Sequence, residues 1–244
     1  MNTLWIFGDS FSAEVNDNNL HENHKKFMEL KGVSTIPSWS SLLSDKLKLN
    51  KNNLSKGGDS NYQMFQNFCD VCHLIQPNDV VIIGWGLISK FRISHNNQFV
   101  NLDPHGLKDI GMVTKKTLDE ILKNRLKNER KNNRRDRWAE EVYLWENVIH
   151  ELSKNKNFEV FFWSTEEPRL IYCESDDFKS KKNYLCSDNK DTMISYLKEF
   201  GCTTMSDETN GEVNDTHFGI EGNIKIAEIF YSDIIKKISK TKLI

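Results

Sequence analysis

The sequence predicts a doubly wound α/β domain, in which a mostly parallel sheet lies between two layers of helices. Two patterns indicate this fold. Short, continuous apolar runs such as Asp79–Trp85 are typical of parallel strands that are buried on both faces. These runs alternate with longer segments, such as Gly222–Ile238, in which apolar residues recur at helical spacing. Strands that alternate with helices favour a parallel sheet with helical crossovers.

Five segments are predicted as the strands of this sheet. Most are rich in β-branched or aromatic residues, and the second is short and polar. In chain order, the predicted strands are Leu4–Phe7, Asn53–Ser55, Asp79–Trp85, Phe158–Trp163 and Cys202–Met205. Ligands of doubly wound folds bind beyond the carboxyl ends of the strands. We therefore expect Ser10, Gly58 and Trp85, which follow strand ends, to gather at one edge of the sheet.

Four segments between the strands have helical periodicity, with apolar residues along one face. The predicted helices are Pro37–Leu49, Asn61–His73, Trp138–Leu152 and Gly222–Ile238. Two polar segments, at about 96–137 and 166–190, break the alternation and are interpreted as insertions above the sheet. No linker or internal repeat divides the chain, so residues 1–244 are predicted to form a single domain.

The composition excludes several classes of partner. The formal net charge is −2, which implies no general attraction to nucleic acid or to a membrane surface. A basic stretch at 123–137 lacks interleaved aromatic residues and is interpreted as a solvated insertion, with contact to an anionic polymer as the alternative. The chain has neither a run of about 18 apolar residues nor a basic, apolar leader. We expect no membrane span, no signal peptide, and a location in the cytoplasm or in a virus particle.

The five cysteines form no dense framework, which agrees with a reducing compartment. Cys69 and Cys72 have the spacing of a metal-binding pair, but a zinc site needs a second pair of ligands at similar spacing. Both cysteines share a predicted helix face with Met64 and Phe68, so core packing is the favoured interpretation. We expect no metal and no organic cofactor.

Two short motifs near the ends of the chain carry the chemistry. Gly8-Asp9-Ser10 follows the first predicted strand, and Asp215-Thr216-His217 precedes the last predicted helix. A serine, a histidine and an aspartate form a nucleophilic site when a fold brings them together. Each motif also has an ordinary structural interpretation: Ser10 as a turn residue or helix cap, and residues 215–217 as a polar loop before a helix.

Together with Gly57-Gly58-Asp59-Ser60-Asn61, these motifs resemble the SGNH (GDSL-type) hydrolase superfamily in order and spacing. The resemblance implies a flavodoxin-like, three-layer fold with a mostly parallel five-stranded sheet. It implies a serine esterase that acts on small acyl esters, O-acetyl groups on a carbohydrate above all. The spacing of Asp215 and His217 is similar to that of alginate-type O-acetyltransferases and many phage-encoded members. Transfer to a sugar hydroxyl, and a non-catalytic carbohydrate-binding or structural module of a phage particle, are the alternatives.

The resemblance also implies a role for each matched residue. Ser10 matches the nucleophile, His217 the general base, and Asp215 the carboxylate that orients the base. The backbone N–H groups of Ser10 and Gly58 match two donors of the oxyanion hole. The family usually supplies a third donor from an asparagine in a Gly-x-Asn arrangement, where this chain has Gly84-Trp85-Gly86.

Asn61 is the nearest candidate to supply the missing amide, with a helix N-cap as its alternative. Four further residues are predicted to contact substrate. Asp9 and Phe11 flank Ser10, Trp85 is expected at the rim of the site with core packing as its alternative, and Arg92 could pair with a carboxylate or sulfate on a glycan. The predicted partner is a small-molecule or glycan ester, and the oligomeric state stays open.

Overall fold

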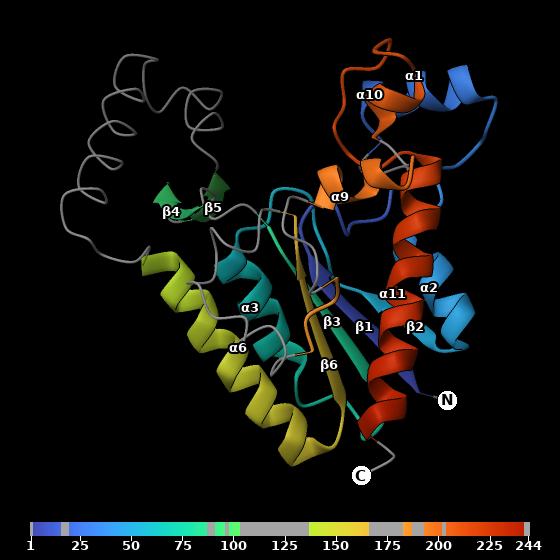
Figure 1. Cartoon of the computed structure of the whole chain (residues 1–244). Coiled ribbons are helices and arrows are strands. Elements are labelled where there is room, and N and C mark those ends of the chain that lie inside the picture. The colour runs from blue at the N-terminus through green and yellow to red at the C-terminus, as the bar shows by residue number, and fades with distance from the viewer. Residues whose placement is uncertain are drawn as a thin grey trace.

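A computed structural model describes residues 2–15, 20–86, 91–95, 98–102, 137–165, 183–186, 193–201 and 204–241. Its centre is a parallel sheet of four strands in the order β2-β1-β3-β6 (Figure 1). The strands are β1 (Thr3–Gly8), β2 (Asn50–Asn53), β3 (Val80–Trp85) and β6 (Glu159–Ser164). The α/β class and the parallel sheet predicted from the sequence are confirmed.

Helices cover both faces of the sheet. Successive side chains of a strand point to opposite faces, so each strand contributes to a hydrophobic core on either side. Leu4 and Ile6 pack with helices α2 (Trp39–Leu47) and α11 (Ile220–Thr241). Trp5 and Phe7 pack on the other face with α3 (Asn61–Val71) and α6 (Arg137–Lys156). Figure 1 shows α3 and α6 on one side of the sheet and α2 and α11 on the other. The four predicted helices are thus confirmed, with ends that differ by a few residues.

In the described part of the chain, three short helices were not predicted: α1 (Glu22–Lys31), α9 (Met193–Glu199) and α10 (Met205–Glu208). Helix α1 is rich in charged residues and buries only His24 and Phe27, so its apolar periodicity is weak. Helix α10 occupies part of the segment predicted as the fifth strand. That prediction is wrong for Thr204 and Met205, because Thr204 caps a helix by accepting a hydrogen bond from the Asp207 N–H at 3.2 Å.

The sheet therefore has four named strands in the described part of the chain, and not five. Two isolated bridges flank them: Phe162 pairs with Tyr184 in parallel, and Thr204 pairs with Phe218 in antiparallel. The strand predicted at 53–55 is displaced: β2 begins at Asn50, where it pairs with Thr3 of β1, and ends at Asn53, so the two ranges share Asn53 alone. Strand β4 (Phe91–His95) lies just before the first predicted insertion and pairs in antiparallel with β5 (Gln98–Leu102), which lies within it. Residues 103–136, with most of the basic stretch, and residues 166–182 and 187–192 lie outside the described residues.

The strand order places a topological switch at β1. The chain leaves β1 toward β2 on one side and returns to β3 on the other. The loops that follow β1 and β3 consequently diverge at the carboxyl edge of the sheet, where a crevice for ligands is expected. Helices α1 and α10 lie beyond this edge, opposite the end at which β1 begins (Figure 1). No helix in the described ranges is long and apolar enough to cross a membrane.

Candidate active site

Ser10 lies in a tight turn at the end of β1. The N–H groups of Ser12 and Ala13 donate to the Asp9 carbonyl at 3.0 and 2.9 Å, and the Phe11 N–H donates to Asp9 Oδ1 at 3.0 Å. These bonds use the N–H groups that follow Ser10 in the turn. The Ser10 N–H itself has no hydrogen-bond partner among the described residues. The turn thus presents one hydroxyl and one unpaired N–H at the same residue.

The loop that follows β2 approaches this turn. A Cβ atom on Gly57 would lie 3.9 Å from the Ser10 Cβ. Gly58 has a φ of +85°, a conformation that residues with a side chain rarely adopt. Within the described ranges its N–H also lacks a hydrogen-bond partner. Two unpaired N–H groups therefore lie on adjacent loops at the same edge of the sheet, as an oxyanion hole requires.

His217 and Asp215 form a close pair in the loop before α11. The Asp215 Oδ1 atom lies 2.6 Å from His217 Nδ1 and also accepts the His217 backbone N–H at 2.9 Å. Burial alone raises the pKa of the Asp215 carboxyl, but the hydrogen bonds from His217 outweigh it and hold the pKa below its ordinary value. The carboxylate is therefore ionised at neutral pH, and it fixes the Nδ1 side of the ring. Nε2 is the nitrogen left to act on a substrate or on a hydroxyl.

Backbone contacts to helix α10 hold this loop in place. The Met205 N–H donates to the His217 carbonyl and the Ser206 N–H donates to the Asp215 carbonyl, both at 2.9 Å. The first N–H groups of a helix have no partner inside the helix, so they are available for such contacts. Helix α1 contacts the same loop, since Asn23 Nδ2 donates to the Asn214 carbonyl at 3.1 Å. Two helices missed by sequence reasoning thus position the histidine.

Asn223 and Trp39 join the two ends of the chain. The Asn223 side chain accepts the Trp39 N–H at 2.9 Å and donates to the carbonyls of Phe218 and Gly219. Trp39 Nε1 donates to the Phe11 carbonyl at 2.9 Å. These buried bonds link the turn after β1, the start of α2 and the start of α11. They explain how motifs more than 200 residues apart come together.

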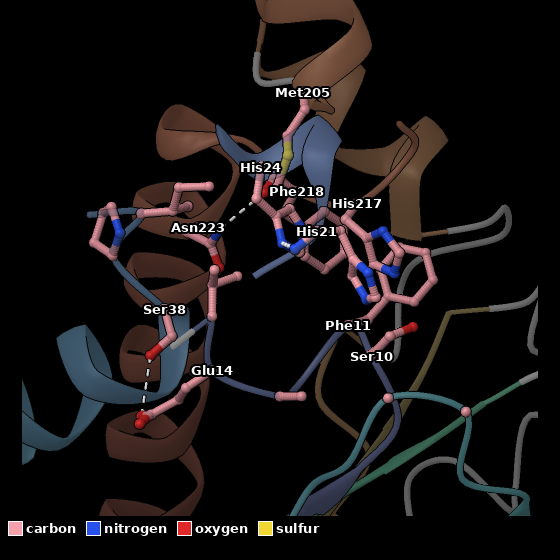
Figure 2. A pocket seen from close by; sticks show the side chains of 16 residues that line it. Ser10, Phe11, Glu14, His21, His24, Ser38, Met205, His217, Phe218 and Asn223 are labelled. Atoms are coloured by element: carbon pink, nitrogen blue, oxygen red, sulfur yellow. Dashed lines mark hydrogen bonds between the residues drawn. The ribbon is translucent and has the colours of Figure 1, made fainter. Parts of the chain in front are cut away.

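Around these residues lies a cavity of about 320 Å³. Ser10, Phe11 and His217 lie on one side of it, and Ser38 and Glu14 lie on the other (Figure 2). The Phe11 ring contacts the His217 ring, with centres 4.8 Å apart, so Phe11 lines the cavity as predicted. The full lining comprises Ser10, Phe11, Ala13, Glu14, Val15, His21, His24, Ile36, Pro37, Ser38, Gly57, Gly58, Met205, His217, Phe218 and Asn223.

Ser10 and His217 share the cavity, but no hydrogen bond joins the Ser10 hydroxyl to the His217 ring. A hydroxyl rotates about a single bond, and contacts of this kind are often long until a substrate is bound. The structure thus brings the three predicted catalytic residues to one place and leaves the last contact open. His217 is about one-third exposed, which gives a substrate access to its ring.

Asn61 does not line the cavity. Its side chain lies against Gly86, where Oδ1 accepts the Gly86 N–H at 2.8 Å and Nδ2 donates to the Gly86 carbonyl at 3.2 Å. The helix cap of α3 is Ser60, whose Oγ accepts the Gln63 N–H, so the alternative of Asn61 as the cap is wrong. Asn61 instead ties the loop after β3 to the start of α3. The missing third donor is not supplied by this amide in the geometry observed.

The position of the missing asparagine is filled by another side chain. A Cβ atom on Gly86 would lie 2.5 Å from Asp9 Oδ2, and real Cβ atoms do not approach so closely. Asp9 is 1% exposed and does not line the cavity. Its carboxylate supports the turn at Phe11 and occupies the space beside Gly86. The structure thus places Asp9 in the interior, away from any substrate in the cavity.

Trp85 is wholly buried in the core on the α3 and α6 side of the sheet. Its Nε1 donates to Glu146 Oε1 at 2.7 Å. A ring with no exposed surface cannot stack on a sugar, so the core-packing alternative describes this residue. Arg92 lies on strand β4, and its side chain is outside the described part of the structure.

The cavity also contains residues that sequence reasoning missed. His21 and His24, three positions apart at the start of α1, both line it, and their ring centres are 5.4 Å apart. Residues three apart on a helix share a face, so their spacing was a usable signal. Glu14 lines the opposite side, where its carboxylate accepts hydrogen bonds from Lys51 and Ser41. Among the described residues, no group of three or more His, Cys, Asp or Glu side chains is arranged to hold a metal ion.

Comparison with solved structures places this geometry in a known fold. The YXIM protein of Bacillus subtilis matches with a TM-score of 0.50 at 11% identity, over 97% of this chain and 56% of that one. A psychrotrophic esterase from a Pseudoalteromonas species matches at 13% identity and a TM-score of 0.44, over 98% and 100% of the two chains. The structural neighbours are GDSL-type lipases and esterases. Carbohydrate esterases are also among them.

One of these, a carbohydrate esterase family 2 enzyme with a carbohydrate-binding domain from Myceliophthora fergusii, matches at 10% identity and a TM-score of 0.43. That match covers 98% of this chain and 67% of the fungal one. No family model matches the sequence, and no curated protein matches it. The similarity to these solved structures is therefore one of fold alone. Identities this low assign no activity to the chain.

Proposed function

We propose that this chain is a serine esterase that removes small acyl groups, O-acetyl groups of a carbohydrate above all. One observation carries the proposal. Ser10, Gly58 and His217 line one cavity beyond the carboxyl edge of the sheet, Asp215 is bonded to the His217 ring, and the N–H groups of Ser10 and Gly58 have no partner in the described part of the chain. Nucleophile, oriented base and oxyanion donors are the three parts that acyl transfer requires.

The proposed reaction begins with Ser10. Its Oγ attacks the ester carbonyl carbon while His217 Nε2 takes the hydroxyl proton, and the carbonyl oxygen becomes an oxyanion that accepts the Ser10 and Gly58 N–H groups. The bond to the alcohol then breaks, and His217 returns the proton to the alcohol oxygen. Water, deprotonated by the same nitrogen, then attacks the acyl-serine. The bond between the acyl carbon and Ser10 Oγ breaks, His217 returns the proton to Oγ, and the acid leaves. Asp215 stabilises the imidazolium that forms in each half of the reaction.

The side chains that line the cavity favour a substrate with a small acyl group. Phe11 and Phe218 contact each other with ring centres 5.1 Å apart and bound the cavity beside His217. Large side chains so near the nucleophile leave little room for a long acyl chain. The polar residues on the far side, Glu14 and Ser38, suit an alcohol that carries hydroxyl groups.

A second candidate is a module that keeps the fold and binds carbohydrate without hydrolysing it. Two observations favour it: Gly86 offers no side-chain amide, and Ser10 and His217 are not hydrogen-bonded to each other. One missing oxyanion donor costs about 10²–10³ in rate. Transfer of the acyl group to a sugar hydroxyl uses the same residues, and product analysis with an added sugar acceptor distinguishes it from hydrolysis.

Labelling with a fluorophosphonate probe tests the esterase proposal directly. This reagent forms a covalent bond with an activated serine, so mass spectrometry should find a single adduct on Ser10. Ser10→Ala and His217→Ala should each prevent labelling, whereas Ser34→Ala, an exposed hydroxyl outside the cavity, should not. Absence of an adduct in the folded wild-type chain would favour the binding module.

A further inference from the structure

A second histidine, His24, lies in the cavity beside the catalytic pair. It is the third residue of α1, and only 8% of its surface is exposed. The centres of the His24 and His217 rings are 6.5 Å apart, and both rings line the same cavity (Figure 2). Buried polar groups in folded proteins almost always have hydrogen-bond partners. We therefore consider which hydrogen-bond partner each of the two ring nitrogens of His24 has.

The Nδ1 atom of His24 accepts the backbone N–H of His21 at 3.4 Å. A ring nitrogen that accepts a hydrogen bond carries no proton, so the neutral ring carries its hydrogen on Nε2. Burial lowers the pKa of His24, and this effect exceeds the opposing attraction of Asp215. The ring is therefore neutral near pH 7, with Nε2–H as a donor.

No residue in the described part of the chain accepts this Nε2 hydrogen. An N–H group left without a partner in a protein interior destabilises the folded state. The cavity is the remaining place for a partner, because the ring forms part of its wall. Solvent satisfies the donor in the free protein, and a bound molecule that displaces the solvent must supply an oxygen there.

We propose that His24 is a substrate-binding residue that donates its Nε2 hydrogen to a second oxygen in the alcohol portion of the ester. This inference rests on the proposed function. His217 protonates the leaving alcohol, so the ester oxygen lies at the His217 ring, while the oxyanion lies at the N–H groups of Ser10 and Gly58. The His24 ring also lies near His217, on a different element from the oxyanion donors.

The spacing of the two rings indicates the class of alcohol. A hydrogen bond adds about 3 Å between heavy atoms at each ring. Two rings with centres 6.5 Å apart can therefore contact two oxygens of one small molecule. A polyhydroxy alcohol such as a sugar has a second oxygen close to the ester oxygen, whereas a simple alkyl or aryl alcohol has none. The site should accordingly prefer sugar esters.

The first test determines the tautomer of the His24 ring, which can be measured whether or not the protein is an active enzyme. The full chain labelled with ¹⁵N-histidine should show His24 with a protonated Nε2 and an unprotonated Nδ1 near neutral pH. The His24→Gln variant assigns the signal by its loss. A protonated Nδ1 would overturn the proposal, because the donor would then point at the His21 backbone.

The second test compares two substrates, glucose pentaacetate and p-nitrophenyl acetate. His24→Phe keeps a ring but removes the donor, so kcat/KM for the sugar ester should fall about three- to tenfold relative to that for the aryl ester, the range of one neutral hydrogen bond. His24→Gln keeps an N–H donor and places a favoured capping residue at the third helical position. It should restore the ratio to nearly that of the wild type. An unchanged ratio in His24→Phe, with both variants folded by circular dichroism, would overturn the proposal.

Failure of the proposed function gives a different result. In that case the wild-type chain would show no Ser10-dependent turnover of either ester. Titration of the labelled wild-type chain with glucose pentaacetate would still report on His24. A shift of its Nε2 proton signal would support the donor role in a binding module, and no shift at saturating ester would overturn it.

Discussion

The loops that follow β1 and β3 begin on neighbouring strands at the same edge of the sheet, yet they differ in what they offer a ligand. The loop after β1 presents the Ser10 side chain to a cavity, and no described residue accepts the Ser10 N–H. In the loop after β3, Trp85 is buried, and both the N–H and the carbonyl of Gly86 are bonded to Asn61. One loop is open and the other is closed.

This difference shows what a strand end determines and what it does not. Topology brings both loops to the edge where ligands bind. Whether a residue at the end of a strand can contact a ligand then depends on the face of the sheet toward which its side chain points. Trp85 shares the face of Ile83 and Val81, two and four residues earlier, so strand alternation directs it into the core with α3 and α6. The turn after β1 breaks the alternation before Ser10, which frees that side chain.

Removing the open loop's hydroxyl should have the largest effect. Ser10→Ala and His217→Ala should each lower kcat for p-nitrophenyl acetate by on the order of 10⁴- to 10⁶-fold, because members of such a triad act as a unit. The double variant should be hardly worse than either single one. Steady-state kinetics measure the loss, and circular dichroism checks the fold. Activity in Ser10→Ala equal to that of the wild type would show that another residue is the nucleophile.

A substitution at Gly86 tests whether the closed loop, which follows β3, can supply a third oxyanion donor. Gly86→Asn would place an asparagine where the resemblance to SGNH hydrolases predicts one. The Asp9 carboxylate lies 2.5 Å from the position of the new Cβ, so we expect overpacking and a loss of about 3 kcal/mol in the free energy of unfolding. Urea denaturation measures this loss. A stable variant with a raised kcat would show instead that the oxyanion hole accepts a third donor here.

Truncation of Asn61 separates support of the loop from catalysis. Asn61→Ala leaves the Gly86 N–H and carbonyl without their partner, which should cost about 1–2 kcal/mol of stability. Gln66→Ala, on the same helix, removes only a surface hydrogen bond to Asp70 and should cost much less. Both variants should keep a kcat within about threefold of the wild type, well below the 10²–10³ that a lost oxyanion donor costs. A loss of that larger size in Asn61→Ala alone would make its amide a donor.

Much of the fold could be predicted because local patterns and global structure agree. The apolar runs at Leu4–Phe7 and Phe158–Trp163 became strands that are buried on both faces. The second strand was displaced because Asn50–Asn53 is polar and lies at the edge of the sheet, where its sequence has no apolar signal. The predicted fifth strand is wrong at Thr204 and Met205 because Thr204 caps a helix through a local hydrogen bond that apolar composition does not reveal, and residues 202–203 lie outside the described residues.

The candidate site was predictable where a short motif determines a turn, and not where packing decides. Ser10, Gly58, His217 and Phe11 line the cavity as their motifs suggest. The burial of Trp85 and Asp9 depends on helices and loops from distant parts of the sequence. His24 was missed because its helix has little apolar periodicity. Its position beside His217 exists only in the folded chain.

The smallest expected effect concerns the pH dependence of stability. It involves His24, which lines the same cavity as Ser10 in the open loop. Burial sets the pKa of His24 below its unfolded value near 6.5, so the unfolded chain binds this proton at a higher pH than the folded chain does. Stability should therefore decrease as pH falls through the unfolded value, until the folded ring is protonated as well. The lowered pKa of Asp215 acts in a separate, more acidic window, where its stabilising effect is lost. Thermal melts from about pH 7.5 to 5 should show a shallower decrease in His24→Gln than in the wild type. Equal slopes would mean that protonation of His24 costs the fold nothing, and that its ring is as well solvated as an exposed one.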